Sequence, residues 1–151
     1  MSRHFRVEDA ERLLPEVERA LREAIRWKRE YDESEQVLGA RLQRLSQLGG
    51  VLVDRDAIIA LRDQREQAAA QLRESIEQVH EAGCELKDLD IGLIDFRTYY
   101  RGEEVYLCWK LGENGISWWH GLHDGVRGRR PIDDDFIQNH SGDSSHQAPP
   151  V

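Results

Sequence analysis

The residues best suited to chemistry lie in the last third of this 151-residue chain. Glu113 and His120 stand in an aromatic, largely apolar stretch whose texture is typical of β-strands. A carboxylate and an imidazole on such a face would have shifted pKa values, and would suit acid–base chemistry or metal binding. The structural alternative is a buried histidine with its hydrogen bonds satisfied, beside a glutamate that faces water at a turn.

His120 and His123 form a His-x-x-His pair, with Asp124 directly after it. On a helix this spacing would make a chelate, but on a strand the two rings point to opposite faces of the sheet. A shared ion therefore requires the strand to end at Gly121. His120, His123 and Glu113 are on this basis the candidate ligands of a divalent metal.

Asp95 and Cys108 are expected to lie opposite each other on neighbouring strands. An adjacent carboxylate raises a thiol pKa rather than lowering it, so this pair is poorly suited to nucleophilic catalysis. Cys108 is interpreted more simply as a small buried residue. Asp95 and Cys108 nevertheless remain candidates for binding a ligand.

Glycine flanks a cluster of arginines between Gly125 and Pro131, which includes Arg127 and Arg129. Backbone amides freed by glycine, together with guanidinium groups, suit a carboxylate or phosphate, so a small anionic ligand is one interpretation. The other is a loop whose arginines pair with Asp133–Asp135 or with acidic helices.

The composition excludes several classes of protein. The net charge of −8 argues against nucleic-acid binding by bulk electrostatics, and no apolar run is long enough to span a membrane. The first residues do not resemble a signal peptide. Cys84 and Cys108 are the only cysteines, which excludes zinc-ribbon spacing and a disulfide framework. These features predict a cytoplasmic protein.

Apolar residues follow a heptad from Val7 to about Leu48, which predicts a long coiled-coil-like helix that ends at Gly49-Gly50. The a and d positions, eight of ten apolar, are Leu14, Val17, Leu21, Ala24, Lys28, Tyr31, Glu35, Leu38, Leu42 and Leu45. A connection over residues 51–54 leads to a second helix, which starts near residues 54–56 and is stopped by Gly83. The pair is expected to form an antiparallel hairpin.

The first helix is the longer of the two, so residues 7–20 should extend beyond its partner. Their apolar face needs another surface, and the C-terminal half is the candidate. Pro15 is expected to kink the helix or split off a first short turn. Phe5 is placed to act as a hydrophobic staple.

Eight of the eleven aromatic residues lie between Phe96 and Phe136, where glycine is also frequent. Arg101-Gly102 and Asn114-Gly115 separate three strand-like runs, which predicts a meander with an additional short strand near residues 85–89.

Two-residue loops at both turns would pair Tyr100 with Glu103 and Glu113 with Ile116. This register places His120 beside Trp109 on the core face and Asp95 on the opposite face. A slip of one residue would exchange the faces of a strand.

The sequence thus predicts an α+β protein with a long antiparallel helical hairpin (residues 1–83) and a small three- to four-stranded antiparallel β-sheet (residues 84–136). The sheet is expected to pack on the start of the first helix. Residues 137–151 are expected to form a disordered acidic tail.

Several segments match, in order, the signature of a widespread bacterial domain family of unknown function. They are Phe5–Pro15, Glu85–Asp90, Gly92–Phe96, Tyr106–Glu113, Trp118–His120 and Gly125–Pro131. The resemblance covers residues 5–132 and implies a small cytoplasmic bacterial protein, without implying a reaction, substrate or cofactor. Arg6 stands where the family usually has a threonine that caps the helix, which predicts a weaker cap.

Two hypotheses for function follow. The first is a non-enzymatic binding module with a polar-aromatic pocket that uses Glu113, His120 and Arg129, and with a hairpin that contacts a second copy or a protein partner. The second is a metal-assisted hydrolase that uses His120, Glu113 and Asp95 or His123.

Overall fold

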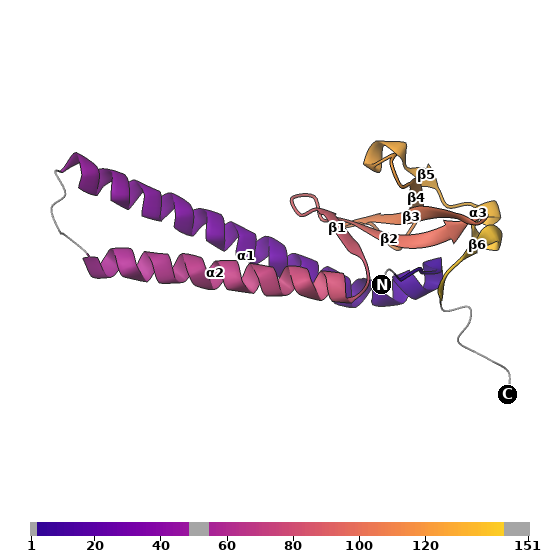
Figure 1. Ribbon diagram of the computed structural model, residues 1–151, viewed down its shortest axis with the longest axis horizontal. Helices are drawn as coiled ribbons and strands as arrows, with labels where there is room; N and C mark the ends of the chain where they lie inside the picture. The colour runs from indigo at the N-terminus through magenta and orange to yellow at the C-terminus, as the bar shows by residue number, and fades with distance from the viewer. Residues whose placement is uncertain (1–2, 49–54, 144–151) are drawn as a thin grey trace, which may run out of the picture.

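The computed structural model describes residues 3–48 and 55–143, which form an α+β fold (Figure 1). Two long helices, α1 (Val7–Gln47) and α2 (Arg55–Glu81), lie side by side as an antiparallel hairpin. The outer half of the hairpin extends away from the sheet. The predicted fold class is therefore confirmed. In the described part of the chain, neither long helix is apolar enough to cross a membrane.

The seam of the hairpin uses small and aliphatic side chains, whereas Leu42, one of the predicted seam positions, is 40% exposed. Leu21, Ala24 and Leu38 of α1 are buried, as are Ala68 and Val79 of α2. Such narrow residues let two helices approach closely, which explains why this half of the chain contains so few aromatic residues. The predicted end at Gly49-Gly50 and the connection over residues 51–54 lie outside the described residues.

Gly83 ends the second helix in the way that the sequence predicts. Its φ is +102°, and its amide donates to the carbonyl of His80. A Cβ atom at this position would lie 2.7 Å from Cζ of Phe5. Glycine is therefore required both by the backbone conformation and by the close approach of the buried Phe5 ring.

The start of α1 supplies the layer that covers the sheet. Helix α1 runs unbroken through Pro15, so the expected separate first turn does not form. Val7, Ala10 and Val17 are buried in one core with Phe96 and Leu107 of the sheet. The first residues of α1 therefore share their core with the sheet. Phe5 joins the same core, with its ring edge-on to Phe96.

The sheet has six strands, all paired antiparallel. They are β1 (Glu85–Asp88), β2 (Leu93–Tyr100), β3 (Glu103–Lys110), β4 (Trp118–Gly121), β5 (Arg130–Pro131) and β6 (His140–Ser141). The order is β1-β2-β3-β4-β5, and β6 pairs with the end of β2. The predicted pairing of Tyr100 with Glu103 is confirmed, and Arg101 and Gly102 both have positive φ, as a tight two-residue turn requires.

The predicted register between β3 and β4 is wrong. Cys108 pairs with Trp118 and Tyr106 with His120, so β4 is shifted by three residues from the two-residue hairpin expected at Asn114-Gly115. Because three is odd, every side chain of β4 changes face. Residues 111–117 form a wider loop instead.

Three side chains hold this wider loop, two of them from residues distant in the sequence. The amide of Ile116 donates to Oε2 of Glu11 on α1, and Nε1 of Trp109 donates to the carbonyl of Glu113. Arg129 binds the Glu113 carboxylate from beyond β4. The amide of Ile116 and the carbonyl of Glu113, which the expected two-residue hairpin would have paired with each other, therefore bind other partners.

The C-terminal segment is ordered further than expected. Residues 137–143 are part of the fold: α3 (Asp134–Asn139) precedes β6, and Asp133 caps the helix by accepting from the amide of Phe136. Residues 144–151 of the expected tail lie outside the described residues.

His140 explains how α1 begins with Arg6 at its N-cap position. Nδ1 of His140 faces the carbonyls of Phe136 and Ile137, which leaves Nε2 to accept from the amide of Val7 at 3.1 Å. The side chain of His140, 133 residues from Val7, therefore replaces the missing local cap.

Candidate functional site

A polar face of the sheet carries the residues that sequence reasoning singled out. Side chains alternate along a strand, so β2 and β3 direct their large apolar residues toward α1 and the residues between them to the other side. The loop with the 3₁₀ turn η1 (Val126–Gly128) lies on that other side (Figure 1). The observed register of β4 adds His120 to this face, beside Asp95 and Cys108.

Asp95, Cys108 and His120 form a compact buried cluster, each from a different strand. Nε2 of His120 lies 3.1 Å from both carboxylate oxygens of Asp95. One ligand atom from each of the three residues lies within 4.8 Å of the other two. The residues are 2%, 0% and 3% exposed, respectively. The corrected register is what brings them together.

Hydrogen bonds set the charge of His120. Burial lowers the pKa of its imidazole, but hydrogen bonds to Asp95, Cys108 and the carbonyl of Gly121 outweigh burial and raise that pKa to about 10. In the absence of any bound ion, His120 is therefore an imidazolium at neutral pH, paired with the Asp95 carboxylate. The buried pair carries no net charge.

Glu113 does not join His120, as the predicted pocket required. Its carboxylate makes a bidentate pair with Arg129 at 2.6 and 2.8 Å, and accepts from the amide of Lys110. Burial raises the pKa of Glu113, but hydrogen bonds from Arg129 and from the Lys110 amide lower it by more. The pKa of Glu113 therefore lies below its usual value. Arg129 also donates to the carbonyl of Cys108 and lies over the Trp118 ring. This pair clamps the wide loop to β3.

The remaining predicted residues lie apart from the cluster. His123 is exposed at the rim of an open hollow that Arg130 and Trp119 also line. Arg127 is exposed in η1. The structure therefore does not gather His120, His123 and Glu113 around one point. Arg129 pairs with Glu113 rather than with the acidic segment after β5, where Asp135 binds Arg101 and Tyr100 instead.

Sequence reasoning missed an ion-pair network on the same face. Arg97 donates to Glu85 at 2.6 Å and to Glu104 at 2.7 Å, and Glu104 also contacts His4 at 2.6 Å. Tyr106 donates to Glu85 and lies against His120. The alternation of β2 and β3 places Arg97 and Tyr106 on this face, and that alternation was the signal available in the sequence.

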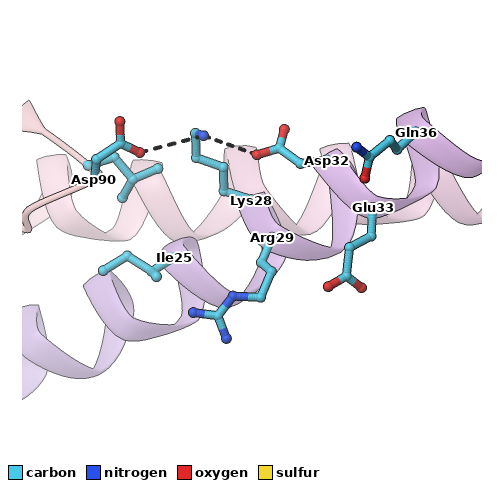
Figure 2. A pocket seen from close by; sticks show the side chains of 8 residues that line it. Ile25, Lys28, Arg29, Asp32, Glu33, Gln36 and Asp90 are labelled. Carbon is cyan, nitrogen blue, oxygen red and sulfur yellow. Dashed lines mark hydrogen bonds and ion pairs between the residues drawn. The ribbon is translucent and has the colours of Figure 1, made fainter.

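A separate hollow lies where α1 passes the β1–β2 loop (Figure 2). Lys28 lies between Asp32, at 3.2 Å, and Asp90, at 3.5 Å. The figure shows Ile25 on one side and Gln36 on the other, with Arg29 and Glu33 turned away. The hollow is open, and Lys28 pairs with both aspartates. These ion pairs hold the β1–β2 loop against α1 rather than presenting a group that could bind a ligand.

The fold and the site define an α+β protein whose antiparallel sheet holds a buried aspartate–cysteine–histidine cluster. Residues 3–132 match the model of the family described as "Uncharacterized conserved protein (DUF2203)", and the chain belongs to that family. This match supports the resemblance to a family of unknown function. No curated protein and no solved structure matches the chain.

Proposed function

We propose that this protein is a non-enzymatic interaction module whose helical hairpin associates with a second copy of the chain. The observation that carries the proposal is a stripe on α1, defined as Glu30, Glu33, Val37, Arg41 and Arg44, in which Glu30 is half-buried and the other four residues are exposed. At 100° per residue these positions fall within about 40° of Val37 around the helix. Val37 is 48% exposed at the centre of the stripe.

The stripe is arranged symmetrically about Val37. Glu33 and Arg41 stand four residues to either side of Val37, and Glu30 and Arg44 stand seven residues to either side. If two α1 helices cross antiparallel at Val37, Glu33 of each copy meets Arg41 of the other, and Glu30 meets Arg44. Such an arrangement is self-complementary, as a two-fold interface requires.

An exposed apolar residue extends the stripe on the outer half of the hairpin. Leu48 is 61% exposed and lies about 20° from Val37 around the helix. Within residues 3–48 and 55–143, no third layer covers this half of the two helices, and Figure 1 shows it extending beyond the sheet. Apolar burial would supply affinity, whereas the exposed charge pairs would mainly set direction and register.

The burial of the cluster argues against the alternative, a metal-assisted hydrolase. A hydrolytic metal needs an open coordination position that the substrate reaches. Asp95, Cys108 and His120 are at most 3% exposed. Glu113, an expected ligand or base of that hydrolase, is held by Arg129. The geometry therefore favours the interaction module.

Light scattering over a range of protein concentrations tests self-association. We expect the wild-type protein to be a dimer and Val37→Glu to be a monomer, because two carboxylates would meet at the centre of the interface. Ile91→Glu is the matched control, since Ile91 is 45% exposed but lies on the β1–β2 loop. Leu38 is unsuitable for this test because it is buried in the hairpin seam.

A charge exchange tests the antiparallel register. Glu33→Lys alone places a lysine opposite Arg41 and should weaken the dimer, as should Arg41→Glu alone. The double variant Glu33→Lys/Arg41→Glu restores opposite charges and should recover the dimer. A wild-type protein that remains monomeric at the highest concentration refutes the proposal. Failure of the double variant to recover the dimer refutes the register.

A further inference from the structure

The Asp95–Cys108–His120 cluster has the composition of a metal site. Its three residues offer one oxygen, one sulfur and one nitrogen ligand atom, and these atoms lie within 4.8 Å of one another. All three side chains are buried, and they come from β2, β3 and β4. Of the metal candidates from the sequence, His120 belongs to this set, whereas His123 and Glu113 do not.

The hydrogen bonding of His120 directs its second nitrogen into the cluster. Nδ1 lies 2.8 Å from the carbonyl of Gly121, to which its N–H donates. Nε2 is then the atom that faces Asp95 and Cys108. Metal-binding histidines usually donate their other N–H to a carbonyl or carboxylate, which fixes the tautomer and the ring orientation.

We propose that Asp95, Cys108 and His120 bind one Zn²⁺ through a carboxylate oxygen, Sγ and Nε2. Tetrahedral zinc with ordinary bond lengths separates its nitrogen and oxygen ligands by about 3.3 Å and its sulfur and nitrogen ligands by about 3.6 Å. The observed separation of 3.1 Å between Nε2 and the Asp95 oxygens is close to that requirement. Small side-chain movements bring the three ligand atoms to this geometry.

Charge balance supports a divalent ion in this buried position. A carboxylate, a thiolate and a neutral imidazole carry two negative charges, which one Zn²⁺ cancels. The complex therefore places no net charge in the sheet, where an unpaired charge would be costly. Thiolate and imidazole ligands select zinc over Mg²⁺ or Ca²⁺, which prefer oxygen.

The location of the site indicates a structural role for the ion. It would connect three neighbouring strands next to the wide loop of residues 111–117. Because the site has almost no exposed surface, the ion would be held by the folded sheet and would stabilise it. This role is independent of the proposed self-association, which uses the outer half of the hairpin.

The competing interpretation is a simple Asp95–His120 ion pair, in which the thiol plays no part. Cys108→Ser separates the two, because it removes the sulfur ligand while leaving the ion pair intact. Cys84→Ser is the matched control. Cys84 is also buried, but its thiol donates to the carbonyl of Val79, a bond that serine can keep.

The experiment uses the full chain, purified without an affinity tag from cells grown with added zinc. Elemental analysis should find about one zinc per chain in the wild type and in Cys84→Ser. After exchange into Co²⁺, both should show a near-ultraviolet thiolate-to-cobalt absorption band. Cys108→Ser should lose the band and bind zinc more than about tenfold more weakly, with an unchanged circular dichroism spectrum.

Two outcomes would overturn the proposal. One is a wild-type protein that purifies without zinc, shows no cobalt band and gains no thermal stability from added Zn²⁺. The other is a cobalt band that persists in Cys108→Ser or disappears in Cys84→Ser, because the ligand would then be a different residue. The wild-type measurements decide the question even if a variant fails to fold.

Discussion

Replacing Asp95 with asparagine should destabilise the metal-free protein by an amount that depends on pH. The change preserves the size of the side chain but removes the charge that faces His120 at 3.1 Å. Both residues are at most 3% exposed, so solvent cannot replace the missing carboxylate. Removing one partner of a buried ion pair typically costs about 3–5 kcal/mol.

The sign of the pH dependence follows from the raised pKa of His120. In the wild type this pKa is about 10, against 6.5 for an unperturbed histidine. The stabilisation from the protonated ring is therefore complete below about pH 6.5, declines as pH rises, and is lost above about pH 10. In Asp95→Asn, burial acts without the opposing carboxylate, so folding favours the neutral ring and acid destabilises the variant.

Urea unfolding at pH 5.5, 7 and 9 in chelating buffer measures this effect. We expect the free energy difference between wild type and Asp95→Asn to reach about 3–5 kcal/mol at the lowest pH and to shrink as pH rises. Cys84 does not titrate in this range, because burial, followed by the charges of Asp95 and Glu85, raises its pKa to about 12. NMR titration of the His120 ring provides an independent readout.

Either of two results would refute this reasoning. A penalty that is equal at all three pH values would show that Asp95 acts by packing rather than by charge. A His120 ring that titrates near pH 6.5 in the metal-free wild type would show that the carboxylate does not hold its proton.

Two further substitutions test how the wide loop and the sheet are held. Arg129→Lys keeps the positive charge but loses the bidentate geometry with Glu113, so calorimetry should show about 1 kcal/mol of destabilisation; an unchanged melting temperature would contradict the clamp. Gly92→Ala places a Cβ 2.5 Å from that of Leu111 at a φ of +66° and should cost about 2 kcal/mol. Gly102→Ala, with a φ of +80° and nothing within 4 Å of its Cβ, is the control and should cost less; equal losses would mean that φ alone matters.

Local patterns were sufficient to predict the helical hairpin and the first sheet turn. The seam residues Leu21, Ala24 and Leu38 follow a period that belongs to the helix itself, so their burial could be inferred without knowledge of the rest of the fold. The turn at Arg101-Gly102 is equally local, because its positive φ values satisfy a two-residue hairpin.

The composition of the candidate cluster could be only partly predicted. Asp95 and Cys108 were paired correctly, since the register of β2 and β3 follows from the tight turn between them. His120 was assigned to the opposite face because Asn114-Gly115 strongly resembles a two-residue hairpin. The true loop depends on Glu11 and Arg129, which lie far from it in the sequence.

The sequence by itself therefore determined the helical hairpin, the polar and apolar faces of β2 and β3, and the residue types available for chemistry. Only the tertiary structure decided which face His120 occupies and that His140 caps α1. The physical reason is that strand register changes face with each single-residue step. A few hydrogen bonds between residues distant in the sequence, which no local pattern encodes, determined the register of β4 against β3.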